Sequence, residues 1–176
     1  MAITDWNLSV DSFIPGEMLT REEENEETGV HTKEITFATG HETIEVGTLA
    51  ELKPWKEIEA LGNPISGIGT YTATFTLPED FDPASGKALF KAGSFNYGTA
   101  SLEINGQSVP LNMDSARADI TEALTAGENT ICVKVTSSLR NVARTVPYIF
   151  WLGGNFDPGE DDYGMVGNTV VVLTRE

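Results

Sequence analysis

Residues 66–78, SGIGTYTATFTLP, are the stretch of the chain that decides the fold. Every second residue from position 71 onward is apolar, and threonines fill the positions between; the apolar residues are Tyr71, Ala73, Phe75 and Leu77. Alternation with period two is typical of a strand that buries one face, and Thr and Tyr fit such a pleated surface well. The stretch therefore predicts a β-strand with one face in a core and threonines on the other.

The same alternation recurs on both sides of this strand. It is found in Trp6, Leu8 and Val10, in Ile44 and Val46, in Leu102 and Ile104, in Ile131, Val133 and Val135, and in the apolar run 170–173. Turn sequences separate these segments, and helical turns are expected only around Pro54 and in residues 119–126. Many short strands spaced in this way predict an all-β protein, an antiparallel β-sandwich of the jelly-roll type. We expect residues 1–176 to form a single domain.

The charge of the chain excludes two classes of partner. Eleven Lys and Arg against 27 Asp and Glu give a formal net charge of −16. Such a surface repels phosphate groups, so neither a nucleic acid nor a membrane is expected as a partner. Neither a signal peptide nor an apolar run of about 18 residues is present, so export would require a signal elsewhere in a longer protein. Six of the glutamates fall in residues 17–27, where a run of like charges predicts a solvated loop or edge.

Several short motifs follow one another in an order that is found in a known family. After residues 66–78 come ASLEING at 100–106, ADITEAL at 118–124 and AGENTICVKV at 126–135, flanked by LKPW at 52–55 and DYGMVG at 162–167. Together they resemble the galactose-binding-domain-like sandwich, which is the sugar-binding domain of family 2 glycoside hydrolases and an accessory module of α-L-rhamnosidases. The resemblance covers residues 50–173. It implies a non-catalytic module of a larger secreted polysaccharide-degrading enzyme, with no required cofactor and with the structural Ca²⁺ that such sandwiches often carry.

These motifs also have local physical reasons. We expect Gly67 and Gly69 to let the backbone turn tightly into the first core strand. Asn105 and Gly106 supply the positive φ angles of a two-residue hairpin turn. Asp119 or Thr121 is expected to cap the short helical turn that follows.

The order of the strands sorts the loops into two ends. Antiparallel succession brings residues 53–69, 93–98 and 137–168 to one end, which we call end A. Sugar rings present apolar faces that stack on Trp and Tyr, and hydroxyl groups that pair with Asn, Asp and Arg. The predicted ligand-binding residues are Trp151 and Tyr97 as stacking platforms, Arg140, Asn141 and Asp157 as polar contacts, and Arg144, Tyr148, Phe156 and Trp55 beside them.

Each of these residues also has a structural interpretation. Trp55 beside Pro54 is also what a buried loop anchor looks like. Trp151 could belong to another core strand, and Asn141 could simply close a strand. Arg140 and Arg144 could balance local acid.

Reactive chemistry has little support in the sequence. His31 and His41 do not form a metal-ligand pattern with Cys132, whose alternation with Ile131 and Val133 places it on the opposite face of a strand. The acidic string at 157–162 lacks the spacing of a calcium-binding loop and reads either as solvated or as a Ca²⁺ site.

The sequence therefore predicts a module that attaches a tethered glycoside hydrolase to a polysaccharide. A neutral polysaccharide is favoured, because the net charge repels uronates. One alternative is a structural accessory domain that packs on a catalytic module and binds no sugar. Another, a small jelly-roll glycosidase or lyase, would require an isolated acid or Tyr deep in a cleft.

Overall fold

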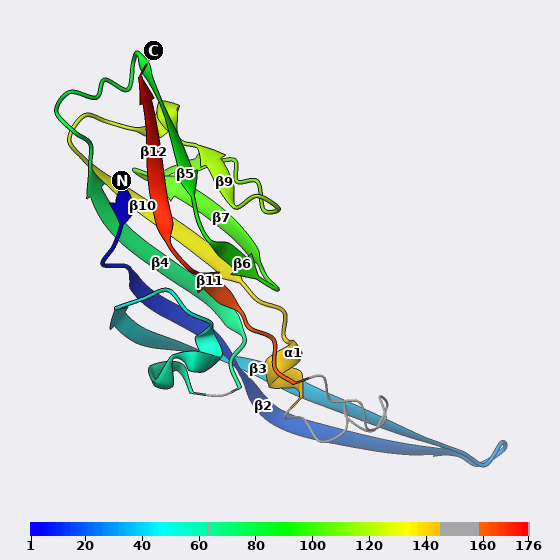
Figure 1. Cartoon of the computed structure of the whole chain (residues 1–176). Helices are drawn as coiled ribbons and strands as arrows, with labels where there is room; N and C mark the ends of the chain where they lie inside the picture. Colours follow the sequence, from blue (N-terminus) through cyan, green and yellow to red (C-terminus); the bar gives the residue numbers. More distant parts are fainter. Residues whose placement is uncertain (63, 145–158, 176) are drawn as a thin grey trace.

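The computed structural model describes residues 1–62, 64–144 and 159–175, and shows two antiparallel sheets packed face to face with a third, small sheet (Figure 1). The four-stranded sheet has the order β1 (Ala2–Ile3), β12 (Thr169–Arg175), β5 (Gly86–Lys91) and β9 (Arg117–Asp119). The six-stranded sheet has the order β3 (Val30–Thr48), β2 (Asn7–Asn25), β4 (Gly67–Thr76), β10 (Glu128–Thr136), β7 (Thr99–Ile104) and β8 (Gln107–Val109). The small sheet pairs β11 (Gly164–Val166) with β6 (Ser94–Asn96). Within these described ranges lie four short helices, η1 (Trp55–Glu57), η2 (Glu59–Leu61), η3 (Thr121–Ala123) and α1 (Arg140–Ala143).

The core lies between the two large sheets and is built from the alternating residues of the central strands. Val133 of β10 faces Tyr71 of β4 on one side and Leu102 of β7 on the other, and all three are buried. Phe90 of β5 is buried in the opposite sheet. Full burial of each such side chain stabilises the folded state by about 1.5–3 kcal/mol. The prediction of an all-β antiparallel sandwich is confirmed.

The turn motifs at the end opposite to end A are joined into one hydrogen-bonded network. Asn105 and Gly106, with φ angles of 52° and 77°, form the predicted two-residue turn between β7 and β8. The Asn105 side chain donates to Asn129 Oδ1 at 2.8 Å and accepts from the backbone of Thr130 at 2.9 Å. Asn129 is itself buried. The two asparagines therefore tie the β7–β8 turn to the start of β10, a role that turn chemistry alone did not indicate.

Gly67 and Gly69 leave room for neighbouring atoms to pack against β4, so the prediction that they form a tight turn is wrong. Both lie inside β4. A Cβ atom on Gly69 would sit 2.4 Å from Cζ2 of Trp55, and one on Gly67 would sit 2.1 Å from the carbonyl oxygen of Asp11. Glycine is required here because β2 and the Trp55 ring approach the β4 backbone too closely for any side chain.

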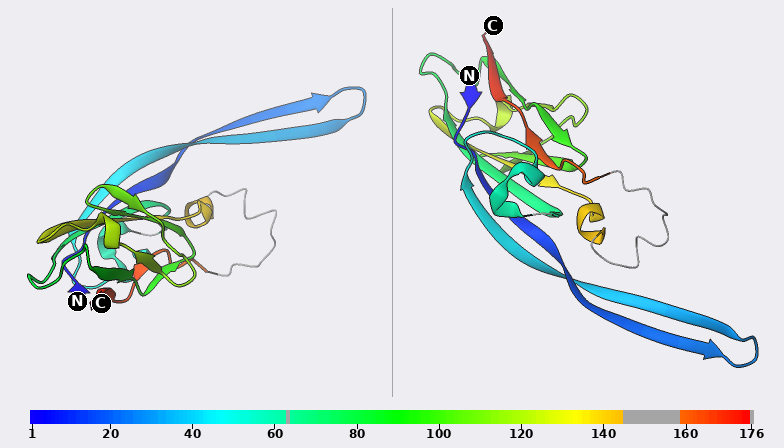
Figure 2. Two further views of the ribbon diagram at one scale, coloured as in Figure 1. Left: turned by 90° about the horizontal axis from the view of Figure 1, so that it is seen from above. Right: turned by 60° about the horizontal axis from the view of Figure 1, so that its bottom comes forward.

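A long β-hairpin projects from the sandwich, and we call its residues 13–41 the arm (Figure 2). Strand β2 pairs with β4 from Asn7 to Ser12, and beyond that point it continues paired with β3. The acidic run 17–27 is therefore mainly part of a strand and its turn. It is solvated, as expected, but as a regular ribbon rather than as a loop.

Within the part of the chain that the structure describes, no helix has the length and apolar character needed to cross a membrane.

Candidate functional site at end A

The strands place the predicted loops at one end. Strand β10 runs antiparallel to β4, so that Thr136 at the end of β10 faces Ile68 near the start of β4. The small sheet and α1 lie at this same end (Figure 1). Two regular elements, α1 and β11, lie within residues 137–168.

Hydrogen bonds and an ion pair join the two chain segments that flank residues 145–158. The Asn141 side chain donates to the carbonyl oxygen of Asp161 at 3.1 Å and accepts from the backbone N–H of Asp161 at 3.0 Å. Arg140 forms an ion pair with the Asp161 carboxylate and donates to the carbonyl oxygen of Gly159 at 3.3 Å. Tyr163 donates to Asp161 Oδ2 at 2.9 Å. We call Arg140, Asn141, Asp161 and Tyr163 the loop base.

The electrostatics of the loop base keep Asp161 charged. Burial raises the pKa of its carboxyl, but hydrogen bonds from Arg140 and Tyr163, with the charges of Arg140 and Arg144, outweigh burial and lower the pKa below its ordinary value. Burial raises the pKa of Tyr163. The loop base is therefore a fixed, ionised cluster at neutral pH, and its carboxylate is unsuited to donating a proton.

A buried aromatic layer lies behind the loop base. Trp55 is 0% exposed, and its indole N–H donates to the Tyr71 hydroxyl at 2.7 Å. The same hydroxyl accepts the backbone N–H of Met165 in β11 at 3.1 Å. The Trp55 and Tyr163 rings are in contact, with centroids 6.2 Å apart. Gly164 completes the layer, because a Cβ there would lie 2.9 Å from Trp55. This layer fixes the position of β11 and, through it, of the loop base.

Tyr97 is the exposed aromatic residue that the structure presents at this end. Tyr97 is 73% exposed, and its backbone φ angle is 51°. A φ in this region is uncommon for a residue with a bulky side chain and often accompanies a functional position. Tyr97 directly follows Asn96, whose partner in the small sheet is Gly164, next to Tyr163 of the loop base.

The predicted binding residues are distributed as follows. Trp151, Tyr148, Phe156 and Asp157 lie outside the described residues. Trp55 and Asn141 are fully buried and have no surface for a ligand to contact. Trp55 is the buried anchor of its structural interpretation, whereas Asn141 lies in α1 and does not close a strand. Arg140 and Arg144 lie close enough to the Asp161 carboxylate to lower its pKa. Tyr97 alone among the described candidates presents a broad open face.

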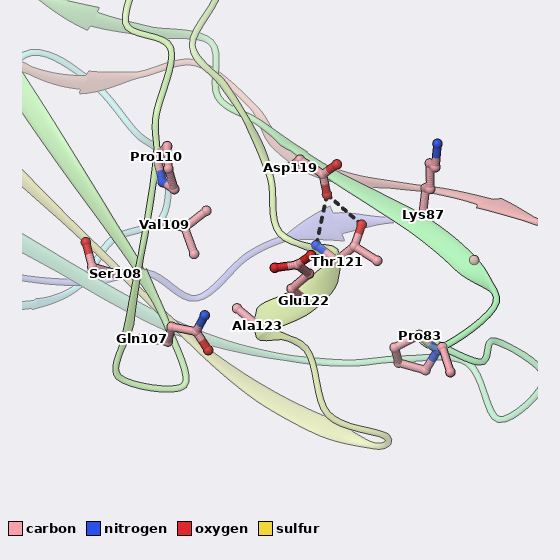
Figure 3. A pocket seen from close by; sticks show the side chains of 12 residues that line it. Pro83, Lys87, Gln107, Ser108, Val109, Pro110, Asp119, Thr121, Glu122 and Ala123 are labelled. Carbon is pink, nitrogen blue, oxygen red and sulfur yellow. Dashed lines mark hydrogen bonds between the residues drawn. The ribbon is translucent and has the colours of Figure 1, made fainter.

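Sequence reasoning did not find the hollows that other described residues line. An open pocket of about 630 Å³ lies at the opposite end of the sandwich (Figure 3), lined by Pro83, Ala84, Gly86, Lys87, Gln107, Ser108, Val109, Pro110, Asp119, Thr121, Glu122 and Ala123. Its lining contains no aromatic ring, and the Asp119 carboxylate accepts hydrogen bonds from the backbone and hydroxyl of Thr121. These bonds join Asp119 to the first residue of η3, but the N-cap position is Ile120 and no side chain makes a capping hydrogen bond, so the predicted capping by Asp119 or Thr121 is wrong. A second hollow, on the outer face of the six-stranded sheet, is also lined mainly by polar residues.

Reactive and metal-binding chemistry has little support among the described residues. Burial, followed by the charge of Glu103, raises the pKa of the Cys132 thiol, which disfavours the nucleophilic thiolate. The part of the chain that is described holds no group of three or more His, Cys, Asp and Glu side chains suited to a metal ion. Asp162, from the predicted acidic string, is paired with Lys56.

Comparison with known proteins adds information on the fold. No protein-family model and no curated protein sequence matches the chain. The fold is similar to that of one part of a solved rhamnosidase structure. The rhamnosidase of Novosphingobium sp. PP1Y matches 98% of this chain with a TM-score of 0.59 and 18% sequence identity. A β-glucuronidase from Faecalibacterium prausnitzii (13% identity, TM-score 0.49) and an α-L-rhamnosidase from Aspergillus terreus (15% identity, TM-score 0.38) match less well, over 99% and 98% of this chain.

The chain spans a small part of each of these proteins. It covers 15% of the Novosphingobium rhamnosidase, 31% of the β-glucuronidase and 24% of the Aspergillus rhamnosidase. The Novosphingobium rhamnosidase matches the fold over nearly the full length of this chain, so the resemblance found in the sequence is confirmed at the level of the fold.

Proposed function

We propose that this chain is a non-catalytic carbohydrate-binding module of a secreted glycoside hydrolase. It forms one domain over residues 1–176 and holds a tethered catalytic module on a polysaccharide. Tethering raises the effective concentration of the catalytic module at its substrate without any new bond chemistry.

The observation that carries this proposal is the presentation of Tyr97. An aromatic ring that is largely exposed loses the free energy of burial, and its positive φ adds backbone strain. Both are offset if the ring serves as a platform for the apolar face of a sugar. The neighbouring loop base supplies rigid support, because its polar groups are fixed by hydrogen bonds.

The charges at end A favour a neutral sugar. The chain as a whole repels anions, and the Arg140 guanidinium is already paired with Asp161. A uronate would have to compete with that carboxylate for the cation. A neutral polysaccharide needs only a stacking face and hydroxyl partners.

A non-catalytic role fits the surroundings of Asp161 and Asp162. A glycosidase requires a carboxylic acid whose pKa is raised so that it can protonate the leaving group. Asp161 has the opposite shift, and Asp162 is paired with Lys56. Neither is poised to act as a general acid.

Affinity electrophoresis on a panel of neutral soluble polysaccharides tests the proposal. Retardation is expected on at least one of them, with about five- to tenfold weaker affinity in Tyr97→Ala, since an aromatic contact contributes about 1 kcal/mol. Val172→Ala is the matched control, because Val172 is an exposed apolar residue on β12. Trp151→Ala tests the second platform predicted from the sequence.

Two outcomes would count against sugar binding at end A. A folded protein that is retarded by none of the polysaccharides would favour the structural accessory domain. Equal loss of retardation in Tyr97→Ala and Val172→Ala would contradict a specific role for the tyrosine. We expect no cofactor requirement, and thermal unfolding with and without EDTA tests separately for a structural Ca²⁺.

A further inference from the structure

The arm extends a two-stranded ribbon into solvent. Beyond Ser12, strand β2 leaves β4, and the backbone bond from Phe13 to the carbonyl oxygen of Ser66 marks the place where the hairpin departs (Figure 2). Exposed apolar side chains occur along it, with Leu19 60% and Val30 56% exposed. A two-stranded hairpin is at best marginally stable in water on its own. An ordered arm of this length therefore points to a partner that covers part of it.

The outer edge of β3 in the arm is open for strand pairing. Strand β3 is the outermost strand of the six-stranded sheet. Along residues 30–41 it pairs with β2 on its inner side. Backbone N–H and C=O groups on an outer strand form a template for an added strand. The arm thus has the geometry for binding an extended segment of another protein.

The charge of the arm decides which segment can bind. It carries seven glutamates against one arginine and one lysine, a net charge of −5 within the −16 of the chain. Five of the glutamates cluster at the tip, at Glu22, Glu23, Glu24, Glu26 and Glu27. The cations of the arm pair with neighbouring acids, Arg21 with Glu23 and Lys33 with Glu22, and these side chains are exposed.

A second copy of this chain is a poor occupant of the edge. Its own arm would bring glutamates opposite glutamates, and like charges in directly opposite positions destabilise a strand pair. A neutral polysaccharide would leave the carboxylates without a charged partner. A strand that carries Lys or Arg would instead gain backbone bonds and opposite charges together.

We propose that the arm is a docking element for a basic partner protein, which adds an extended segment rich in Lys and Arg to the outer edge of β3. The acidic tip attracts the segment, and the backbone of β3 fixes it. Sugar binding at end A is independent of this contact.

The test uses the whole chain and a defined probe, an end-blocked eight-residue peptide of alternating Lys and Thr. Hydrogen exchange at low salt is expected to show slower exchange of backbone amides within residues 30–41 when the peptide is added. Binding should weaken as salt is raised, because exposed charges are screened. A peptide with the same lysines but with Pro in place of Thr cannot form a regular strand, and should bind at least tenfold more weakly.

Two variants with equal net charge locate the contact. The arm variant changes Glu22, Glu23, Glu24, Glu26 and Glu27 to Gln, and the body variant changes Glu51, Glu59, Glu79, Glu122 and Glu128 to Gln; all ten residues are exposed. Both changes take the net charge from −16 to −11. The arm variant is expected to lose at least tenfold in peptide affinity, whereas the body variant stays within about twofold of the unmodified chain. The arm variant should keep its retardation on polysaccharide.

Three results would overturn the proposal. Equal loss of affinity in the two variants would show general attraction to an acidic protein. Equal binding of the proline peptide would exclude strand addition. Exchange in the arm that slows with protein concentration alone would assign the edge to a second copy of the chain.

Discussion

Removing one hydroxyl group tests the buried layer behind end A. In Tyr71→Phe, two buried donors, the indole N–H of Trp55 and the backbone N–H of Met165, lose their acceptor. A buried donor without a partner costs about 1–3 kcal/mol. With partial relaxation, we expect the free energy of unfolding to fall by about 2–4 kcal/mol, which corresponds to a decrease in Tm of about 5–15 °C for a chain of this size. Urea unfolding followed by tryptophan fluorescence measures the change.

The matched control is Tyr97→Phe, because the Tyr97 side chain is largely exposed and its hydroxyl can bond to water. Its unfolding free energy should stay within about 0.5 kcal/mol of the unmodified protein. In a double-mutant cycle, Trp55→Phe should lower the free energy of unfolding by about 1 kcal/mol less in the Tyr71→Phe background than in the unmodified protein. If Tyr71→Phe is no less stable than the control, the hydroxyl does not hold β11 in the way described.

Other perturbations probe the same region. Gly69→Ala should lower the free energy of unfolding by about 1–3 kcal/mol in thermal melts, because its Cβ would lie 2.4 Å from the Trp55 ring; an unchanged Tm would mean that the ring can move away. Asp161→Asn should lower the free energy of unfolding by about 1–2 kcal/mol at pH 7, because its ion pair with Arg140 is lost. The folded-state pKa of Asp161 is lowered, so the difference between the two proteins in urea titrations should shrink as the pH falls below about 4. Burial raises the pKa of Tyr71 to about 12, against about 10 in the unfolded chain. The free energy of unfolding should therefore be constant in this respect below pH 10 and should fall by up to about 2–3 kcal/mol as the pH rises toward 12. Alkaline unfolding of Tyr71→Phe should show a shallower decline.

The sandwich could be predicted from the sequence because its strands bury one face. Burial of alternate residues leaves a period of two in the sequence, as in Tyr71, Ala73 and Phe75, and the Asn105-Gly106 turn requires residues that accept a positive φ. Strand direction then placed the loops correctly at end A. Each of these features has a local physical cause that acts within a few residues.

The arm and the loop base could not be predicted in the same way. Glutamate is depleted in strands, and the side chains of the run at 17–27 that the structure describes are all exposed, so nothing in its pattern distinguishes a ribbon from a loop. The pairing of Asn141 with Asp161 joins positions 20 residues apart, and the burial of Trp55 depends on the space left by Gly69 and Gly164. These features depend on tertiary contacts, which residue type and spacing do not encode individually.

The mutual hydrogen bonds of Asn141 and Asp161 have an evolutionary consequence. They close the chain on either side of residues 145–158 through contacts that involve none of those residues. These bonds therefore hold positions 141 and 161 together without depending on the side chains of the residues between them. Selection for a new ligand can act on a segment whose two ends are fixed in this way, as it acts on immunoglobulin loops carried by a constant framework.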